Sequence, residues 1–265
     1  MDEKIQNRYA FSIDLIKQAG NIALSYYLNR NELVVECKKG DKQDQVSLAD
    51  KTVETIIRKA IAKQFPEDGF LGEESGYAGL DNEFCWIVDP IDGTSPFLNG
   101  LHAWCISIAV LYKDNIVIGM VFDPLHNELF HAQLGAGAYL NNSPMHTINP
   151  AANVQDGLVG LGMSHRVPPD IILPFLHQLL TKGGMYVRNG SGALSLAQVA
   201  AGRLLAYYEP HMNCWDCAAG MLLVREAGGT ANNILANNGL LNGNFVLAAA
   251  NRQVYQQLDL MRILQ

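Results

Sequence analysis

The chain has 265 residues, of which 49% are hydrophobic and 17% charged, and its formal net charge is −7. This composition is typical of a globular protein with a sizeable core, and it excludes a disordered chain. The acidic excess argues against a general binder of nucleic acid or of anionic membranes, because such proteins need a basic patch. A site that handles phosphate here must therefore create its own positive charge, and a metal ion is the simplest way.

Membrane insertion is not expected. The longest apolar run, 103–112, has ten residues, well short of the roughly 20 that span a bilayer. The N-terminus is charged and then shows the pattern of an amphipathic helix, so it does not resemble a signal peptide. The five cysteines are an odd number in mostly apolar surroundings. We therefore expect a reduced, cytoplasmic compartment.

The first elements along the chain are helical. Hydrophobic side chains recur every three or four residues over 5–29, which predicts an amphipathic helix. The polar stretch 36–44 predicts an exposed, mobile loop or hairpin. A second helix should follow, with Ser47 as its N-cap, Asp50 completing an imperfect capping box, and Pro66 ending it.

From residue 84 the pattern changes to strands. A short strand is expected at 84–88, stopping at Asp89, and further strands at 105–112, 116–122, 129–133 and 138–140. In the second half, strands at 158–161, 204–208 and 245–249 alternate with helices at 170–181, 195–202, 218–227 and 254–264. We therefore predict an α/β fold in layers, with an α+β half at 1–145 and an α/β half at 146–265. The two halves should share one extended interface within a single domain spanning 1–265.

Several acidic residues stand where a strand should stop. Glu73 and Glu74 follow a short apolar run, and Asp89 and Asp92 follow another. Asp216 opens a helix rich in small residues, and Asp50 lies on the first turn of the second helix.

The run 89–94 has the chemistry of a metal and phosphate site. Pro90 fixes the backbone, and Gly93 permits a tight turn. Two carboxylates three residues apart, Asp89 and Asp92, can then converge with the carbonyl of Ile91. Oxygen ligands of this kind suit magnesium, manganese or calcium and not zinc. The N–H groups of Gly93 and Thr94 would cradle a phosphate at a helix start. The alternative is a simple turn in which Asp92 only caps a helix.

Other motifs are weaker. Cys214 and Cys217 have the spacing of half a zinc or redox site, but no second pair of ligands stands at suitable spacing, so we interpret them as packing residues. The sequence contains no Walker A loop, nucleophile elbow or dinucleotide fingerprint. These absences remove the commonest nucleotide-binding and serine-hydrolase functions.

At these residues the sequence resembles the inositol monophosphatase family of lithium-sensitive, magnesium-dependent phosphatases. The resemblance covers nearly the whole chain and is carried by four motifs in order, namely 44–50 with Glu54, Gly-Glu-Glu-Ser at 72–75, Asp-Pro-Ile-Asp-Gly-Thr at 89–94, and Cys-Trp-Asp with Ala-Ala-Gly at 214–220. It implies a layered αβαβα sandwich of the sugar-phosphatase type. The sequence departs from the family at Ser95–Phe97, at Asn99 and at 162–166, near the expected substrate.

The resemblance also implies roles for the matched residues. The metal ligands would be Glu73, Asp89, Ile91 through its carbonyl, Asp92 and Asp216. The residues that orient and deprotonate the attacking water would be Thr94 and Asp50, with Glu73 supporting a third, weaker metal. Substrate contacts would come from Asp92, Gly93, Thr94, Ser191, Gly192, Ala193, Glu209 and Asp216. The stretch 38–42 resembles the family's metal-site loop.

The expected reaction is hydrolysis of an inositol monophosphate or a similar phosphorylated polyol. The resemblance implies two to three Mg²⁺ ions, with Mn²⁺ as a substitute and Ca²⁺ and Li⁺ as inhibitors. It also implies a homodimer that needs neither a nucleic-acid polymer nor a membrane. The alternatives are histidinol phosphate, fructose 1,6-bisphosphate or a 3′-phosphoadenosine nucleotide as substrate, a non-catalytic binding role, or a calcium-binding structural protein. Thr94 and Asp50 argue against a purely structural site, which has no need of a pair that activates water.

Overall fold

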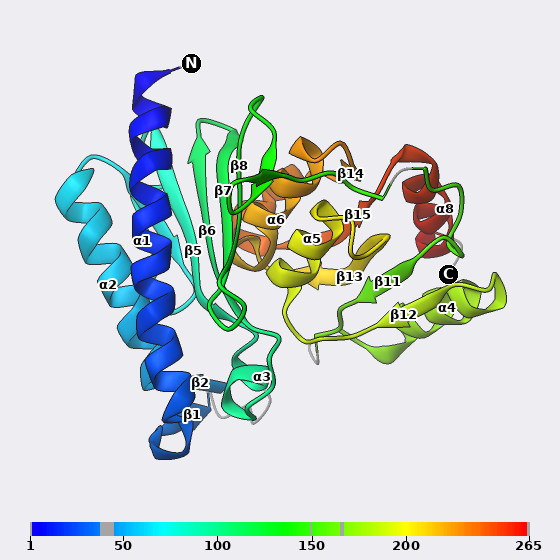
Figure 1. The fold of residues 1–265 in the computed structure, drawn as a ribbon, viewed down its shortest axis with the longest axis horizontal. Coiled ribbons are helices and arrows are strands. Elements are labelled where there is room, and N and C mark those ends of the chain that lie inside the picture. Colours follow the sequence, from blue (N-terminus) through cyan, green and yellow to red (C-terminus); the bar gives the residue numbers. More distant parts are fainter. Residues whose placement is uncertain (1, 38–44, 149, 165–166, 264–265) are drawn as a thin grey trace.

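A computed structural model describes residues 2–37, 45–148, 150–164 and 167–263. The elements stack as five layers, α–β–α–β–α, which follow one another along the long axis of the molecule (Figure 1). This is the layered sandwich that the sequence predicts. Within the described residues, each helix is too short or too polar to cross a membrane.

The first outer layer consists of α1 (Glu3–Leu28) and α2 (Leu48–Gln64), both of which were expected. Ser47 caps α2, and its side chain and that of Asp50 form the predicted capping box. The strands β1 (Val35–Cys37) and β2 (Gln45–Ser47) pair with each other ahead of this helix. The loop or hairpin was expected at 36–44, of which 36 and 37 belong to β1 and 38–44 lie outside the described residues.

The second layer is an eight-stranded sheet in the order β10-β9-β8-β7-β6-β5-β3-β4. Its strands are β3 (Gly69–Gly72), β4 (Gly76–Ala78), β5 (Phe84–Asp92), β6 (Cys105–Tyr112), β7 (Asn115–Asp123), β8 (Glu128–Gln133), β9 (Ala138–Leu140) and β10 (Ser143–Pro144). Neighbours are antiparallel except β3 and β5, which run parallel. This parallel pair brings the ends of two strands to the same edge of the sheet, where the acidic residues follow.

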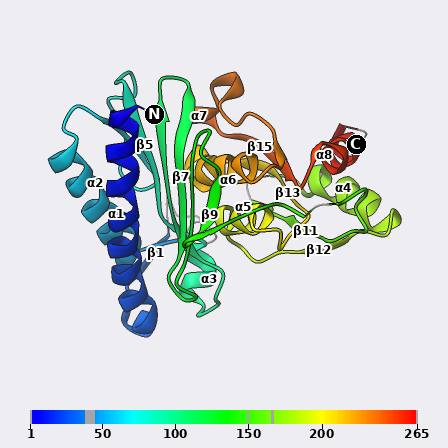
Figure 2. The same ribbon diagram turned by 45° about the horizontal axis from the view of Figure 1, so that its top comes forward.

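The third layer, α5 (Gly192–Ala200) and α6 (Cys214–Glu226), lies between the two sheets, as the turned view in Figure 2 shows. The fourth layer is a five-stranded sheet in the order β12-β11-β13-β15-β14. Its strands are β11 (Leu158–Leu161), β12 (Met185–Val187), β13 (Ala206–Met212), β14 (Thr230–Ala231) and β15 (Asn244–Ala249). The outer helices α4 (Pro169–Thr181) and α8 (Arg252–Ile263) cover its far face.

Side-chain alternation along β5 explains why the large sheet binds helices on both faces. Phe84, Trp86 and Val88 pack with α1 and α2, whereas Cys85 and Ile87 pack with α5 and α6. Successive strand residues point to opposite faces, so a strand buried on both faces has a continuous apolar sequence. The same apolar run led to the expectation of a strand at 84–88.

Several boundaries differ from the sequence prediction, among them the end of β5 and the starts of α5 and α6, and four strands were not predicted. β5 does not stop at Val88 but continues through Pro90 to Asp92, with an irregular register. α5 begins at Gly192 and not at residue 195, because Ser191 caps it and accepts a hydrogen bond from Leu194 N. The unpredicted strands β4, β10, β12 and β14 are the four sheet edges, each two or three residues long.

Candidate active site

The acidic residues singled out from the sequence come together where β3, β5 and α6 meet. The parallel register aligns Gly72 of β3 with Val88 of β5, and Glu73 N donates to Val88 O at 3.3 Å. Glu73 therefore leaves β3 beside Asp89. Asp216 sits on the first turn of α6, where it closes a capping box with Asn213.

A bulge in β5 places Asp89 and Asp92 on the same face. Residues three apart on a regular strand point to opposite faces. Here Asp89 pairs with Ser107 and Asp92 with Cys105, so three steps along β5 oppose only two along β6. The extra residue in β5 is a bulge, and it turns the side chain of Asp92 to the same face of the sheet as that of Asp89. Asp89 Oδ1 accepts a hydrogen bond from Ile91 N at 2.9 Å, which stabilises the bend.

The four carboxylates Glu73, Asp89, Asp92 and Asp216 destabilise one another's charged forms. Burial raises the pKa of Asp89 well above its usual range, and Glu73, Asp92 and Asp216 raise it further. Burial likewise raises the pKa of Asp216, with Glu73 and Asp92 as the next causes. The pKa of Asp92 rises to about 6 through burial, opposed by hydrogen bonds from Ser191 and Ala193.

This donor set fits a divalent cation. Among the described residues, no group of three or more Asp, Glu, His or Cys side chains already has the arrangement of a metal shell. The largest charge effects on Asp89 and Asp216 nevertheless come from other carboxylates. A hard cation such as Mg²⁺ would offset this repulsion with the oxygen ligands that it prefers. The chemistry of the residues present therefore fits such a cation.

Asp92 links the two halves of the chain. Its Oδ2 accepts hydrogen bonds from Ser191 Oγ at 2.5 Å and from Ala193 N at 2.7 Å. Both donors belong to the start of α5, about a hundred residues later in the sequence. Ser191 and Ala193 therefore reach the site through Asp92 and hold its carboxylate in place.

Thr94 and Asp50 meet as the sequence motif implies. Thr94 Oγ1 lies 3.2 Å from both Asp50 Oδ1 and Ile91 O. The other oxygen of Asp50 accepts hydrogen bonds from Ser47 N and Ser47 Oγ at 2.8 and 2.7 Å. Gly93 caps the short helix α3 (Thr94–Leu98) with φ at 95°, and a Cβ there would lie 2.7 Å from Ala103 O. Only glycine fits this turn.

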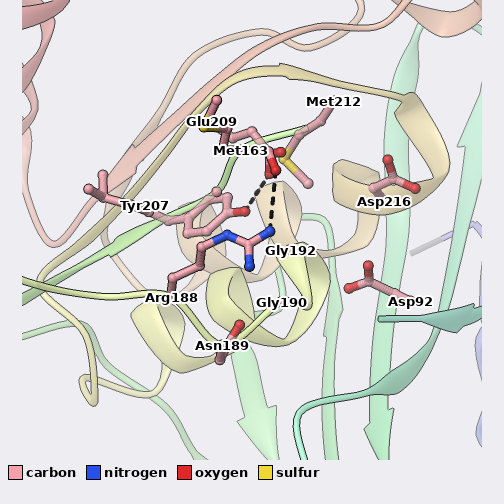
Figure 3. Close-up of a pocket in the computed structure, with 12 residues that line it drawn as sticks. Asp92, Met163, Arg188, Asn189, Gly190, Gly192, Tyr207, Glu209, Met212 and Asp216 are labelled. Atoms are coloured by element: carbon pink, nitrogen blue, oxygen red, sulfur yellow. Dashed lines mark hydrogen bonds between the residues drawn. The ribbon is translucent and has the colours of Figure 1, made fainter. Parts of the chain in front are cut away.

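A cavity of about 130 Å³ opens beside Asp92 and Asp216. Figure 3 shows these two carboxylates at one end and Tyr207 with Glu209 at the other. Tyr207 donates to Glu209 Oε2 at 2.6 Å, and Arg188 donates to Met163 O at 3.3 Å. Burial raises the pKa of Glu209 to about 7, with Asp92 raising it further and Tyr207 and Arg188 lowering it. Gly192 also lines this cavity.

The sequence prediction placed 162–166 near the substrate, but it did not assign Tyr207 to the cavity. Tyr207 lies two residues from Glu209 on β13, so both side chains share one strand face, and this i, i+2 spacing was the available clue. Gly162 permits the close approach, because a Cβ there would lie 2.0 Å from Glu209 Oε2. The expected metal-site loop at 38–42 and residues 165–166 lie outside the described residues.

Cys214 and Cys217 are placed as packing residues. Both are buried and form no disulfide, and Cys217 Sγ donates to Asn213 O at 3.2 Å. Burial raises the pKa of Cys214 to about 12. A thiol of this kind stays protonated at neutral pH and packs as a small apolar group.

Known proteins resemble the chain along most of its length. The family model described as "Inositol monophosphatase family" matches residues 4–263. A relative named "Nus factor SuhB" from Haemophilus influenzae is 35% identical over 254 residues, covering 95% of this chain and 94% of the relative. An "Inositol-1-monophosphatase" from Synechocystis sp. is 38% identical over 238 residues, covering 83% and 82%.

Solved structures share the fold. The extragenic suppressor protein suhB from Bartonella henselae superposes with a TM-score of 0.87 at 33% identity, covering 95% of this chain and 96% of that one. An inositol monophosphatase from Anabaena superposes with a TM-score of 0.83 at 29% identity, covering 98% and 97%.

Proposed function

Because this chain belongs to the inositol monophosphatase family, we propose that it hydrolyses a small phosphate monoester with a metal-activated water. Mg²⁺ is the proposed metal, and an inositol monophosphate or a similar polyol phosphate is the proposed substrate. The observation that supports this most is the group of four mutually repelling carboxylates, two of which, Asp92 and Asp216, line a small polar cavity.

The proposed metal ligands are Glu73, Asp89, the Ile91 carbonyl, Asp92 and Asp216. Bound Mg²⁺ would neutralise the phosphate, lower the pKa of a water and stabilise the leaving oxygen. Asp92 suits this role because Ser191 and Ala193 occupy only its Oδ2. Two to three ions are proposed, with Mn²⁺ as a substitute and Ca²⁺ and Li⁺ as inhibitors.

Thr94 and Asp50 are proposed to orient and deprotonate the attacking water. The Thr94 hydroxyl donates a hydrogen bond to Asp50 Oδ1, so its oxygen can accept one from the attacking water. When the water gives its proton to Thr94, the hydroxyl proton of Thr94 would pass to Asp50. Asp50 is buried and already fixed by two hydrogen bonds from Ser47. A base held in this way loses little entropy when the reaction begins. The N–H groups of Gly93 and Thr94 are proposed to hold the phosphate.

The cavity is proposed to hold the hydroxyl-bearing part of the substrate. Glu209 can accept hydrogen bonds from substrate hydroxyls when ionised and donate one when protonated. Its pKa of about 7 makes both forms accessible near neutral pH. This polar lining favours a polyol and disfavours a flat nucleotide base. Gly192, which lines the cavity, is proposed to contact the substrate together with Asp92 and Asp216, whereas Ser191 and Ala193 are proposed to act on the substrate through Asp92.

A second candidate is a binding role that needs no turnover. It is favoured by relatives that carry the name Nus factor SuhB and are 35% identical to this chain. We also propose that the protein acts in the cytoplasm. We propose further that it is a homodimer, and light scattering after gel filtration can test this.

Phosphate release with Mg²⁺, and again with EDTA, decides between the candidates. The panel is myo-inositol 1-phosphate, histidinol phosphate, fructose 1,6-bisphosphate and 3′-phosphoadenosine 5′-phosphate. Magnesium-dependent release from one compound would support the proposed reaction and identify the substrate class. No release from any of them, with Mg²⁺ still binding, would contradict all four substrates and favour a substrate outside this panel or the binding role.

A further inference from the structure

Glu54 is a buried carboxylate whose role is not explained by the helix that carries it. It lies on α2, one turn after Asp50, and only 2% of its surface is exposed. Its Oε2 accepts a hydrogen bond from Glu74 N at 2.8 Å, and its Oε1 accepts one from Ser75 N at 2.7 Å. A buried carboxylate is costly unless such donors surround it, so this pairing is a built feature of the fold.

These bonds fix the turn that carries Glu73. On one side of the turn, Glu73 N donates to Val88 O of β5. On the other side, Glu54 holds the next two backbone amides. The approach is close, because a Cβ at Gly72 would lie 2.6 Å from Glu54 Oε2. The backbone of Glu73 is therefore held from both sides. Its side chain forms a hydrogen bond with that of Asp89.

Asp50 and Glu54 act from one face of the same helix. Residues four apart on a helix are neighbours on its surface. Asp50 reaches Thr94 after β5, whereas Glu54 reaches the turn after β3. One turn of α2 thus sets the distance between two loops that approach the carboxylates from different strands.

We propose that Glu54 is a positioning residue that places Glu73 for the metal and so determines the affinity for Mg²⁺. This inference rests on the proposed function. Outer partners that orient metal ligands typically change affinity or activity roughly 10- to 100-fold when they are removed. Loss of Glu54 should therefore weaken metal binding more than it slows the metal-saturated enzyme.

A matched control exists in the same chain. Glu226 also accepts two backbone amides, from Gly135 and Gly137 at 2.9 Å each, and so fixes the turn between β8 and β9. Glu54→Gln and Glu226→Gln each keep one accepting oxygen and place an amide nitrogen against the second N–H. Both should lose some stability, but only Glu54→Gln should change the response to metal.

The test measures Mg²⁺ binding by calorimetry, half-saturation of activity by Mg²⁺, and urea unfolding of the metal-free proteins. We expect Glu54→Gln to weaken Mg²⁺ binding and raise half-saturation about tenfold or more, with kcat at saturating Mg²⁺ within about threefold of wild type. Glu226→Gln should bind Mg²⁺ as wild type does. Wild-type affinity in Glu54→Gln, or an equal loss in both variants, overturns the inference.

Two further measurements keep the outcome decisive. If Glu54→Gln does not fold, Glu54→Asp withdraws the carboxylate by one methylene, and the same weakening of Mg²⁺ binding is required of it. If the wild-type protein neither binds Mg²⁺ nor releases phosphate, the proposed function fails, and with it the basis for this inference. If wild type binds Mg²⁺ and the Glu54 variants match it, the inference alone fails.

Discussion

The hydroxyl of Thr94 donates to the carboxylate of Asp50 at 3.2 Å, joining residues 44 positions apart in the sequence. Thr94 begins α3 directly after the bulged end of β5, and Asp50 lies on the first turn of α2. The bond therefore crosses from the large sheet to the outer helical layer. It places the Thr94 hydroxyl next to the buried carboxylate of Asp50 at the edge of the carboxylate cluster.

Thr94→Ala should reduce kcat with little change in Mg²⁺ affinity. Removing a group that orients and deprotonates the attacking water typically costs about 10²- to 10⁴-fold in rate. Thr94→Ser is the control, because it keeps the hydroxyl and should retain most of the activity. Steady-state kinetics and Mg²⁺ calorimetry on both variants test this. A changed Mg²⁺ affinity with unchanged kcat would contradict the assigned role.

Asp92→Asn should reduce the activity more than about 100-fold. This is more than the roughly 10- to 100-fold loss typical of residues that only orient a metal ligand, because Asp92 is proposed to bind the metal itself. The fold should survive, because an asparagine oxygen can still accept from Ser191 or Ala193. Asp123→Asn is the control, since Asp123 is a buried carboxylate that accepts from Leu125 N and His126 N outside the site. Circular dichroism and phosphate release compare the two. Wild-type turnover in Asp92→Asn would refute the metal assignment.

Mg²⁺ affinity should increase with pH. Metal ligands must be deprotonated, and the pKa of Asp92 is raised to about 6 while those of Asp89 and Asp216 are raised well above their usual range. Protons therefore compete with the metal more strongly as the pH falls through 6, and binding releases protons. Calorimetry at pH 5.5, 7.0 and 8.5, in two buffers of different ionisation enthalpy, measures both effects. An affinity that is flat over this range would contradict the raised pKa values.

Glu209 should make the metal-free protein less stable as the pH rises. Its folded pKa of about 7 lies above the usual 4.5, so the folded state favours the protonated form. Its contribution to stability is fully present below pH 4.5 and is lost as the pH rises through 7. The difference between the folded and unfolded pKa of Glu209 corresponds to about 3 kcal/mol of folding stability at most.

Glu209→Gln should remove this contribution and leave the others in place. Urea unfolding in EDTA at pH 5 and pH 8 should show a smaller loss of stability in Glu209→Gln than in wild type. Parallel losses in the two proteins would mean that Glu209 does not carry a raised pKa in the folded state.

Asp68→Ala should destabilise the protein by about 3 to 5 kcal/mol, because it leaves a buried charge unpaired. Asp68 receives two hydrogen bonds from Arg8 at 2.7 and 2.6 Å and one from Trp86 Nε1 at 2.7 Å. Glu128→Ala breaks the more exposed pair with Arg203 and should cost less than about 1 kcal/mol. Thermal and urea unfolding compare the variants. Equal losses would show that burial does not distinguish the two pairs.

Local patterns predicted most of the long elements. The three- to four-residue periodicity of α1, the capping box of α2 and the apolar runs of β5 to β8 are each contained in a short stretch of sequence. The metal-site hypothesis was likewise local, because Asp89, Pro90 and Gly93 restrict one turn. These features depend on propensity and on side-chain alternation, which a single segment expresses alone.

The rest depended on contacts between distant segments. The four unpredicted strands are sheet edges of two or three residues, too short for a period and formed only by pairing with a neighbour. The bulge that puts Asp89 and Asp92 on one face exists only against β6. The hydrogen bonds from Ser191 and Ala193 to Asp92 join residues 99 and 101 positions apart. Those from the turn after β3 to Glu54 join residues 20 and 21 positions apart. The sequence by itself determined which side chains were available, and the tertiary structure decided their distances, because such contacts form only when the layers pack.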